Sequence, residues 1–150
     1  MRVLLQRVLN ASVEVDGLSV GQIGHGLLVF VGFETGDTTE DLDWLTGKVL
    51  RLRIFADENG AMNRSVQDIR GALLVVSQFT LYANTKKGNR PSFIKAAPPA
   101  AAEQMFNEFC ARLSLQIHRS VERGVFGAHM MINLVNDGPV TIWIDSKQRE

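Results

Sequence analysis

The sequence predicts one α+β domain in which two helices pack on an antiparallel or mixed β-sheet. Its 150 residues, 45% hydrophobic and 21% charged, suit a single globular domain with a real core. Apolar runs and alternating patterns typical of strands occupy both ends of the chain and one central segment. Two further segments carry apolar residues at three- and four-residue steps, which is the spacing of helices with one buried face.

The first third of the chain is predicted to form three or four antiparallel strands joined by short turns. Apolar runs or apolar–polar alternation predict strands at residues 3–8, 11–15, 18–23 and 27–33. Asp16-Gly17 is a signal for a tight hairpin turn. Gly24-His25-Gly26 interrupts the next pair of strands, and the glycine-rich segment 21–26 does not match a phosphate-binding loop.

Two helices are predicted from their start signals and apolar faces. The first follows Thr38, because Asp41 comes three residues later as in a capping box. Its apolar face comprises Leu42, Leu45, Val49 and Leu52. The second follows Pro98-Pro99, since proline is tolerated in a first helical turn. Its apolar stripe comprises Met105, Phe106, Phe109, Leu113 and Ile117.

The strongest central strand is predicted over residues 71–82. Its continuous apolar run at 72–76 is typical of a strand buried on both faces. Polar residues begin where this run ends, and strand exits are common places for functional sites. Those polar residues are Ser77, Gln78 and Thr80. Residues 83–95 are predicted to be a loop, and residues 57–60 another. Closing strands are predicted at 120–125, 130–135 and 140–144.

Charge and cysteine content limit the partners and the compartment. Sixteen Lys and Arg residues balance sixteen Asp and Glu residues, so any contact with RNA requires a local patch. The loop with Lys86, Lys87 and Arg90 either follows a phosphate backbone or is a solvated surface loop. Cys110 is the lone cysteine, and no segment is long and apolar enough for a membrane span or signal peptide. We therefore expect a cytoplasmic protein without a membrane partner.

The residues alone do not define a catalytic centre. The three histidines are far apart and no paired-cysteine spacing occurs, so no metal or other cofactor is expected. Cys110 lies on or beside an apolar helix face, which favours a small buried side chain over a nucleophile. Ser77 and Thr80 have no histidine or carboxylate close in sequence, which favours a hydrogen-bonding role. Gly138-Pro139 is typical of a plain turn before the last strand.

Five short segments, spread over nearly the whole chain, nevertheless form an ordered set that can be compared with known families. The most specific is Ser77-Gln78-Phe79-Thr80-Leu81. The others are Met1-Arg2 with Gln6-Arg7-Val8, Lys87-Gly88-Asn89-Arg90-Pro91-Ser92-Phe93, Gly124-Val125-Phe126-Gly127-Ala128-His129-Met130 and Asn136-Asp137-Gly138-Pro139-Val140-Thr141. Each is weak alone. Taken in order, they resemble the D-aminoacyl-tRNA deacylase family, also called D-tyrosyl-tRNA deacylase.

The resemblance implies a barrel-like α+β domain over residues 1–150 and a homodimer with active sites at the subunit interface. The implied substrate is D-aminoacyl-tRNA, and the Gly138-Pro139 bond is expected to be cis and to reach into the partner's pocket. The implied catalytic residues are Ser77, Gln78, Phe79 and Thr80. The implied substrate-binding residues are Gly138, Pro139, Phe126, Ala128, Met130 and Asn136, and the implied tRNA-binding residues are Lys86, Lys87 and Arg90.

These residue types suit a site that reads chirality. Side chains vary among D-amino acids, so a rigid backbone close to the Cα is a better reader than a side-chain pocket. Glycine permits that close approach, and a cis proline fixes the turn. An L-residue is then refused by collision, whereas glycine has no side chain to collide. We therefore expect glycyl-tRNA to be cleaved as well.

Two accounts of catalysis remain open. In one, the 2′-hydroxyl of the terminal ribose assists attack, and the amides of Phe79 and Thr80 bind the oxyanion. In the other, Thr80 is the nucleophile. Two other classes of protein also remain open, a non-catalytic tRNA-binding module and a metal-dependent hydrolase.

Overall fold

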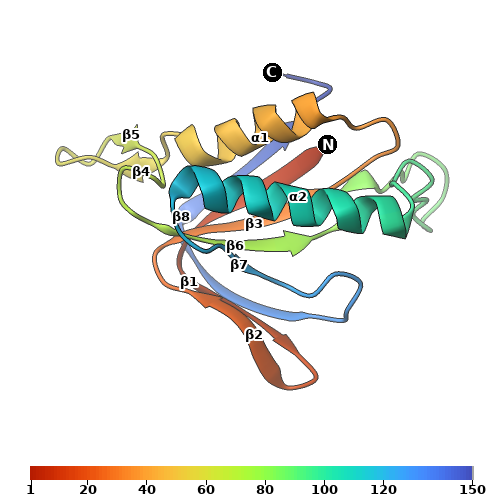
Figure 1. Ribbon diagram of the computed structural model, residues 1–150, viewed down its shortest axis with the longest axis horizontal. Helices are drawn as coiled ribbons and strands as arrows, with labels where there is room; N and C mark the ends of the chain where they lie inside the picture. Colours follow the sequence, from red (N-terminus) through yellow and green to blue (C-terminus); the bar gives the residue numbers. More distant parts are fainter. Residues whose placement is uncertain (150) are drawn as a thin grey trace.

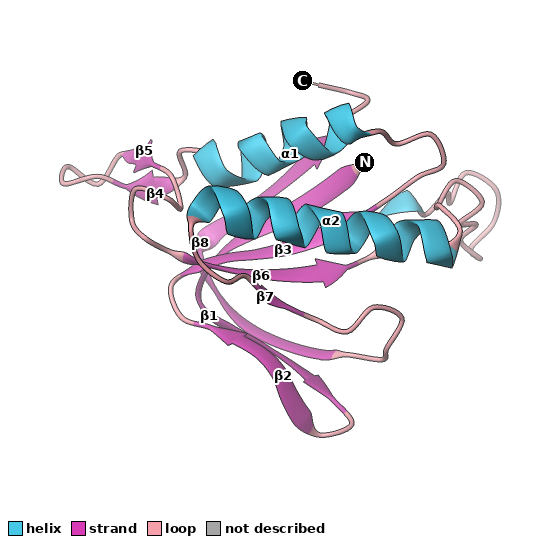
Figure 2. Ribbon diagram, in the orientation of Figure 1, coloured by secondary structure: helices cyan, strands magenta, loops and turns pink. Residues whose placement is uncertain are grey.

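The computed structural model describes residues 1–149 and confirms the predicted fold class. Two helices cover a mixed sheet that is nearly closed into a barrel. Figure 1 shows α1 and α2 side by side across one face of the sheet, while β2 curls away on the other side. The colouring in Figure 2 separates this helical layer from the strands.

The elements follow the predicted order with some changes at their ends. The strands are β1 (Arg2–Val15), β2 (Leu18–Ile23), β3 (Gly26–Gly32), β4 (Phe55–Ala56), β5 (Met62–Arg64), β6 (Ala72–Ser77), β7 (Glu122–Arg123) and β8 (Met131–Asp145). The helices are α1 (Thr39–Arg51), α2 (Pro99–Ile117) and the short 3₁₀ helix η1 (Phe79–Tyr82).

The sheet is built around β1. Along one edge β1 pairs with β8, and along the other it pairs first with β3 and then with β2, all antiparallel. The predicted hairpin turn is confirmed, since Asp16 and Gly17 have φ angles of 51° and 78°. Positive φ at both central residues matches the right-handed twist of the flanking strands.

Strands β3 and β6 are parallel and are buried on both faces, as the apolar run predicted. Alternate side chains of a strand point to opposite faces. Val29 and Val75 therefore contribute to the core beneath the two helices. Leu28 and Leu74 contribute to a second core on the other face of the same strands. This central pair thus joins the helical layer to the curled part of the sheet.

Several predictions of strand bounds are wrong. The strands predicted at 3–8 and 11–15 are one element, β1, since β8 offers pairing partners along both. The strand predicted over 71–82 ends at Ser77, because the chain turns into η1. The strands predicted at 130–135 and 140–144 are one element, β8, since β1 offers pairing partners on both sides of Asn136. The strand predicted at 120–125 is reduced to the two residues of β7, and the loop at 57–60 is the tip of a hairpin formed by β4 and β5.

The predicted start of α1 is confirmed and tied to the end of the chain. Asp41 accepts a hydrogen bond of 2.8 Å from the Thr38 amide, which completes the capping box. The same carboxylate accepts a 2.7 Å hydrogen bond from Lys147 Nζ. Burial raises the pKa of Asp41, but hydrogen bonds from Lys147, Ser146 and Thr38 outweigh burial, and the net pKa lies well below its ordinary value. No helix within residues 1–149 is long and apolar enough to cross a membrane.

We predict that Asp41→Asn destabilises the protein in a pH-dependent manner. The folded pKa of Asp41 is depressed, so its carboxylate stabilises the fold above the unfolded pKa of about 3.9 and that contribution is lost as pH falls below it. At pH 7 the free energy of unfolding should fall by about 1–3 kcal/mol. Urea unfolding at several pH values measures the difference. Glu40→Gln, at an exposed side chain in the same turn, is the control and should have little effect.

Candidate functional site

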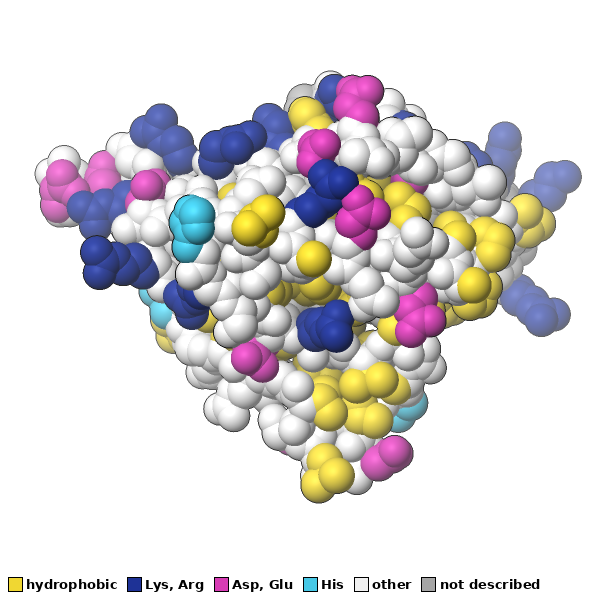
Figure 3. Space-filling view, in the orientation of Figure 1, with side chains coloured by type: hydrophobic (Ala, Val, Ile, Leu, Met, Phe, Trp, Pro, Cys, Tyr) yellow, Lys and Arg dark blue, Asp and Glu magenta, His cyan; other side chains and the backbone are white. Residues whose placement is uncertain are grey.

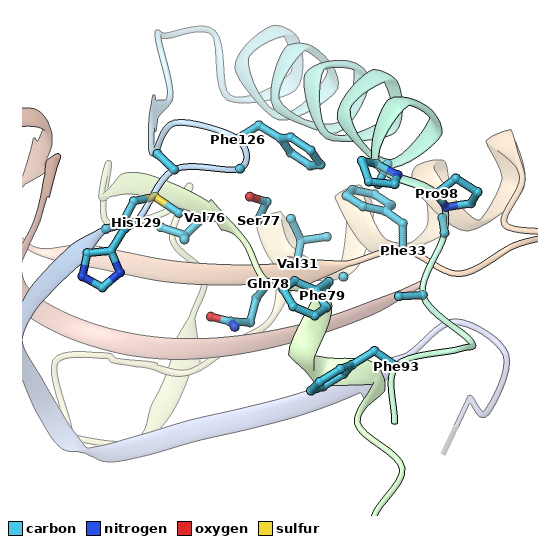
Figure 4. Close-up of a pocket in the computed structure, with 18 of the residues that line it drawn as sticks. Val31, Phe33, Val76, Ser77, Gln78, Phe79, Phe93, Pro98, Phe126 and His129 are labelled. Atoms are coloured by element: carbon cyan, nitrogen blue, oxygen red, sulfur yellow. The ribbon is translucent and has the colours of Figure 1, made fainter. Parts of the chain in front are cut away.

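A cavity of about 740 Å³ opens beside the C-terminal end of β6. Figure 4 shows that its walls come from the end of β6, η1, the loop at 124–130 and the segment before α2. Its lining includes Val31, Phe33, Val76, Ser77, Gln78, Phe79, Phe93, Ala102, Phe126, Ala128, His129 and Met130. Six residues implied by the resemblance, from two distant segments of the chain, thus meet around one cavity. Those six are Ser77, Gln78, Phe79, Phe126, Ala128 and Met130.

The cavity exists because β6 stops and η1 turns tightly against β3. The amide of Gln78 donates a 2.7 Å hydrogen bond to the Val31 carbonyl, the last link between the two strands. A Cβ on Gly32 would lie 2.8 Å from the Gln78 carbonyl oxygen, so only glycine permits this approach. Arg2 holds the other end of η1, since Nη1 donates a 2.9 Å hydrogen bond to the Leu81 carbonyl.

The polar side chains at the end of β6 and just after it differ from one another in their surroundings. The Ser77 hydroxyl points into the cavity below Phe126 (Figure 4). The Gln78 side chain donates a hydrogen bond to the Thr80 hydroxyl. Thr80 is exposed and does not line the cavity. Within residues 1–149, neither Ser77 nor Thr80 forms a hydrogen bond with an imidazole or a carboxylate, so no catalytic triad is present there.

Aromatic rings form much of the wall. Phe79 and Phe93 meet edge to face with ring centroids 5.0 Å apart. Phe126 packs against the core residue Phe106 with centroids 6.0 Å apart, which anchors the loop at 124–130 to α2. Phe79 is 58% exposed. The cavity therefore offers flat apolar surfaces at its mouth to a bound group.

Two main-chain donors belong to η1, whose first residue, Phe79, lines the cavity. The amides of Phe79 and Thr80 open η1, and the first amides of a helix have no acceptor within it. Across residues 1–149 these two amides donate to no other group. Free amides beside an apolar cavity are suited to an oxygen that carries negative charge.

Gly138 and Pro139 are exposed, and the peptide bond between them is cis, as expected. Neighbouring groups hold the segment in place. Arg7 Nε donates a 2.8 Å hydrogen bond to the Asp137 carbonyl, and Arg7 also donates to the Ile54 carbonyl. Asn136 Oδ1 accepts a 2.9 Å hydrogen bond from the Val140 amide. Asn136 therefore shapes the segment from within and does not line the cavity.

The part of the cavity lined by β3 and β6 and the Gly138-Pro139 segment lie at different levels of the sheet. Asn136 pairs with Val8, which pairs with Gly26 at the start of β3. That part of the cavity lies at the other end of β3, where Val31 pairs with Ser77. Five residues of strand, roughly 17 Å, separate the two levels. Within one protomer the dipeptide is therefore remote from that part of the cavity.

Lys86, Lys87 and Arg90 lie in the predicted loop and are exposed to solvent. The loop closes through the bridge between Asn84 and Ser92. Figure 3 shows basic side chains projecting from the edge of the molecule where this loop lies in Figure 1. The three cations are close to the cavity in the chain, because Phe93 follows within the same loop.

The other reactive side chains do not add a second centre. Burial raises the pKa of the Cys110 thiol to about 11, so this side chain is a buried apolar group, as the sequence favoured. The described residues contain no group of three or more His, Cys, Asp or Glu placed to hold a metal ion. His129 is the one histidine of the described chain that lines the cavity.

Several lining residues were not foreseen from the sequence. Phe33 and Ala102 have no polar group, and their sequence context predicts only a strand and a helix. Phe93 and His129 lie in the segments of the resemblance but carry no signal of their own. The role of Arg7 in holding Asp137 is a contact between distant segments, which no local pattern reveals.

The fold and the cavity define a class of small α+β proteins with a mixed sheet nearly closed into a barrel and a pocket at its rim. A family model described as D-Tyr-tRNA(Tyr) deacylase matches residues 4–145. The chain belongs to this family. It is 57% identical over all 150 residues to proteins named D-aminoacyl-tRNA deacylase from Flavobacterium johnsoniae and from Dechloromonas aromatica, covering 100% of each.

Solved structures agree with the fold. A c-Myc DNA unwinding element binding protein superposes with a TM-score of 0.92 at 40% identity, covering 97% of this chain and 98% of that chain. A probable eukaryotic D-amino acid tRNA deacylase superposes with a TM-score of 0.82 at 20% identity, covering 95% and 97%. At 20% identity, this second structural similarity supports the fold alone.

We predict that Gly32→Ala displaces η1 and destabilises the protein by about 1–3 kcal/mol, because the added methyl collides with the Gln78 carbonyl. Urea unfolding measures the change. Gly24→Ala is a matched control, since a Cβ there meets nothing within 4 Å and the change should be nearly neutral. Equal stability of the two variants would contradict the close approach described for Gly32.

Proposed function

We propose that this protein hydrolyses the ester bond of D-aminoacyl-tRNA and releases a free D-amino acid and tRNA. The observation that carries the proposal is the meeting of Ser77–Phe79 with Phe126–Met130 around one cavity in a chain that is 57% identical, end to end, to proteins named for this activity. Translation supplies such a substrate in the cytoplasm, which is where we expect the enzyme to act.

The proposed site is completed by a second copy of the chain. Gly138 and Pro139 are exposed and do not line the cavity of their own protomer. In the proposed twofold homodimer, Gly138-Pro139 of one protomer faces the cavity of the other. By symmetry, Gly138-Pro139 of the second protomer faces the cavity of the first. The dipeptide then reaches into the partner's cavity, and the exposed Phe79 is covered.

Selection against L-residues then comes from the main chain. Gly138 and Pro139 present no polar side-chain atoms, so their carbonyl and Cα groups are what the substrate meets. A Cβ on Gly138 would lie 2.4 Å from the Val140 nitrogen, so the segment keeps its shape only with glycine. An L side chain collides with this backbone, a D side chain points away, and glycine fits.

The proposed reaction needs no side-chain nucleophile. Water adds to the ester carbonyl carbon, the bond from that carbon to the ribose oxygen breaks, and a proton returns to the ribose oxygen. The free amides of Phe79 and Thr80 bind the carbonyl oxygen as its charge develops. The neighbouring 2′-hydroxyl of the ribose orients the attack. In this proposal the Thr80 hydroxyl, which accepts a hydrogen bond from Gln78, is not the nucleophile.

The basic loop completes the proposal. The ester lies at the 3′ end of tRNA, so the adjacent nucleotides leave the cavity through its mouth. Lys86, Lys87 and Arg90 are solvated and lie in the segment that leads to Phe93 in the cavity wall. We assign them to the phosphates of this end of the tRNA.

The activity is tested directly with three charged tRNAs. We expect release of tyrosine from D-tyrosyl-tRNA and of glycine from glycyl-tRNA, and no release from L-tyrosyl-tRNA above the spontaneous rate. Free amino acid is followed over time. If D-tyrosine is released no faster than L-tyrosine, the protein is better described as a tRNA-binding module.

Two substitutions separate the accounts of catalysis. Thr80→Ala should lower kcat/KM by no more than about fivefold, the cost of one hydrogen bond. A nucleophile's loss would lower kcat by orders of magnitude, as in other hydrolases. A substrate that ends in 2′-deoxyadenosine should be cleaved far more slowly than its ribose counterpart. Unchanged cleavage of that substrate would exclude assistance by the 2′-hydroxyl.

A mixing experiment tests the composite site. Gly138→Ala disrupts the donated segment, and Ala128→Trp fills the cavity, so each homodimer should be inactive. Exchange of subunits in a 1:1 mixture gives heterodimers with one intact site, and about a quarter of the wild-type rate should return. If both defects lay in the same subunit's own site, mixing would restore nothing.

A further inference from the structure

A second hollow, of about 260 Å³, lies on the outer surface at the C-terminal end of α1. It is lined by Trp44, Gly47, Lys48, Arg51, Leu52 and Arg53. Figure 3 shows dark-blue side chains on the surface at this end of α1, and dark-blue and magenta side chains together on the neighbouring β4–β5 hairpin. No residue of this hollow takes part in the cavity described above.

The hollow concentrates positive charge in a chain with a net charge of zero. Lys48, Arg51 and Arg53 form no ion pair within residues 1–149, whereas Arg112 on the facing helix is paired with Glu108. Cations in a last helical turn offset the helix dipole, which accounts for Lys48 and Arg51. Arg53 lies beyond the helix and donates hydrogen bonds of 2.8 Å to the Asn63 carbonyl and 2.9 Å to Asn63 Oδ1, neutral acceptors that leave its positive charge uncompensated.

Trp44 lines the hollow, and the cations beside its ring favour the binding of phosphates over the stacking of bases. Lys48 Nζ lies 5.3 Å and the Arg149 guanidinium 4.8 Å from its ring. Two cations beside one ring leave little room for a base to stack on it. The hollow therefore presents charge rather than an aromatic platform, and charge without base contacts is suited to a sugar–phosphate backbone.

The hollow lies at the same end of the protomer as Gly138-Pro139. Arg53 precedes Ile54, whose carbonyl accepts a hydrogen bond from Arg7. The same guanidinium donates to the Asp137 carbonyl, directly before Gly138. One side chain thus joins the rim of the hollow to the segment that the proposed dimer inserts into the partner's cavity.

The geometry points to this hollow as a binding surface for the phosphate backbone of the tRNA that is held in the partner's cavity. This inference rests on the proposed function. The 3′ end enters one protomer's cavity, the solvated Lys86–Arg90 loop of that protomer lies on one side, and the partner's Lys48, Arg51 and Arg53 lie on the other. Binding is indifferent to RNA sequence, because the contacts go to phosphates.

The test compares a full substrate with a minimal one. Lys48→Gln/Arg51→Gln should raise KM for D-tyrosyl-tRNA by about tenfold with kcat unchanged, since each exposed cation contributes up to about fivefold. The slope of log KM against log salt should become shallower by about 0.7–0.9 for each phosphate that the variant no longer neutralises. D-tyrosyl-adenosine, which has no phosphates, should be cleaved as fast as by the wild type.

Two matched variants complete the design. Lys48→Arg/Arg51→Lys keeps the charge and should retain the wild-type KM. Gln104→Glu/Ala111→Glu changes the net charge by the same amount on an exposed face of α2 and should leave KM nearly unchanged. An unchanged KM for D-tyrosyl-tRNA in the Gln variant, or an equal loss with both substrates, would overturn the inference.

Binding of uncharged tRNA distinguishes failure of this inference from failure of the proposed function. If the wild type released D-tyrosine from neither substrate, binding of uncharged tRNA would still test the surface. The Gln variant should then bind about tenfold more weakly than the wild type at the same salt concentration. Equal binding of the two proteins would overturn the inference in that case as well.

Discussion

The close main-chain approach along β3 is the constraint on which the rest of the structure depends. A Cβ on Gly26 would lie 2.0 Å from the Ala72 carbonyl oxygen, and one on Gly32 would lie 2.8 Å from the Gln78 carbonyl oxygen. Glycine at both ends of β3 therefore sets the distance to β6 and to η1. The end of β6 opens the cavity, and η1 supplies the two free amides beside it, so the site inherits its geometry from this close approach.

The proposed function draws on two levels of one sheet. The cavity, η1 and the basic loop occupy the end at which β6 stops. The Gly138-Pro139 segment, Arg7 and the hollow at the end of α1 occupy the other. In the proposed homodimer the two ends meet twice, once at each site. The proposed homodimer covers Phe79, a ring that lines the cavity and is exposed in the single protomer.

Local patterns predicted much of the fold, and contacts between distant segments account for the rest. The hairpin at Asp16-Gly17 and the start of α1 at Thr38 follow from nearby residues, and both are confirmed. The end of β6 depends on Val31 and Gly32, which are more than forty positions away in the chain. The unbroken path of β8 depends on β1, which pairs on both sides of Asn136.

The sequence also predicted only part of the candidate site. The segment Ser77–Phe79 and the loop at 124–130 were named from the sequence, and the structure brings both to one cavity. Phe33 and Ala102 carry no chemical signal and were found only through the fold. Arg7 was noted for its place in a motif, but its contact with Asp137 emerges only when β1 and β8 are paired.

Gly138 and Pro139 have one consequence for how such a protein can change over time. Point mutations exchange side chains, whereas every residue brings the same carbonyl group. In the proposed role, where the backbone of this dipeptide selects the substrate, few mutations give a form between a selective and an unselective site. Mutations can therefore readily abolish the proposed selection between D- and L-residues, but they can scarcely make the site specific for one amino acid. In that proposal, acceptance of many D-amino acids is a property of the backbone architecture rather than of any one side chain.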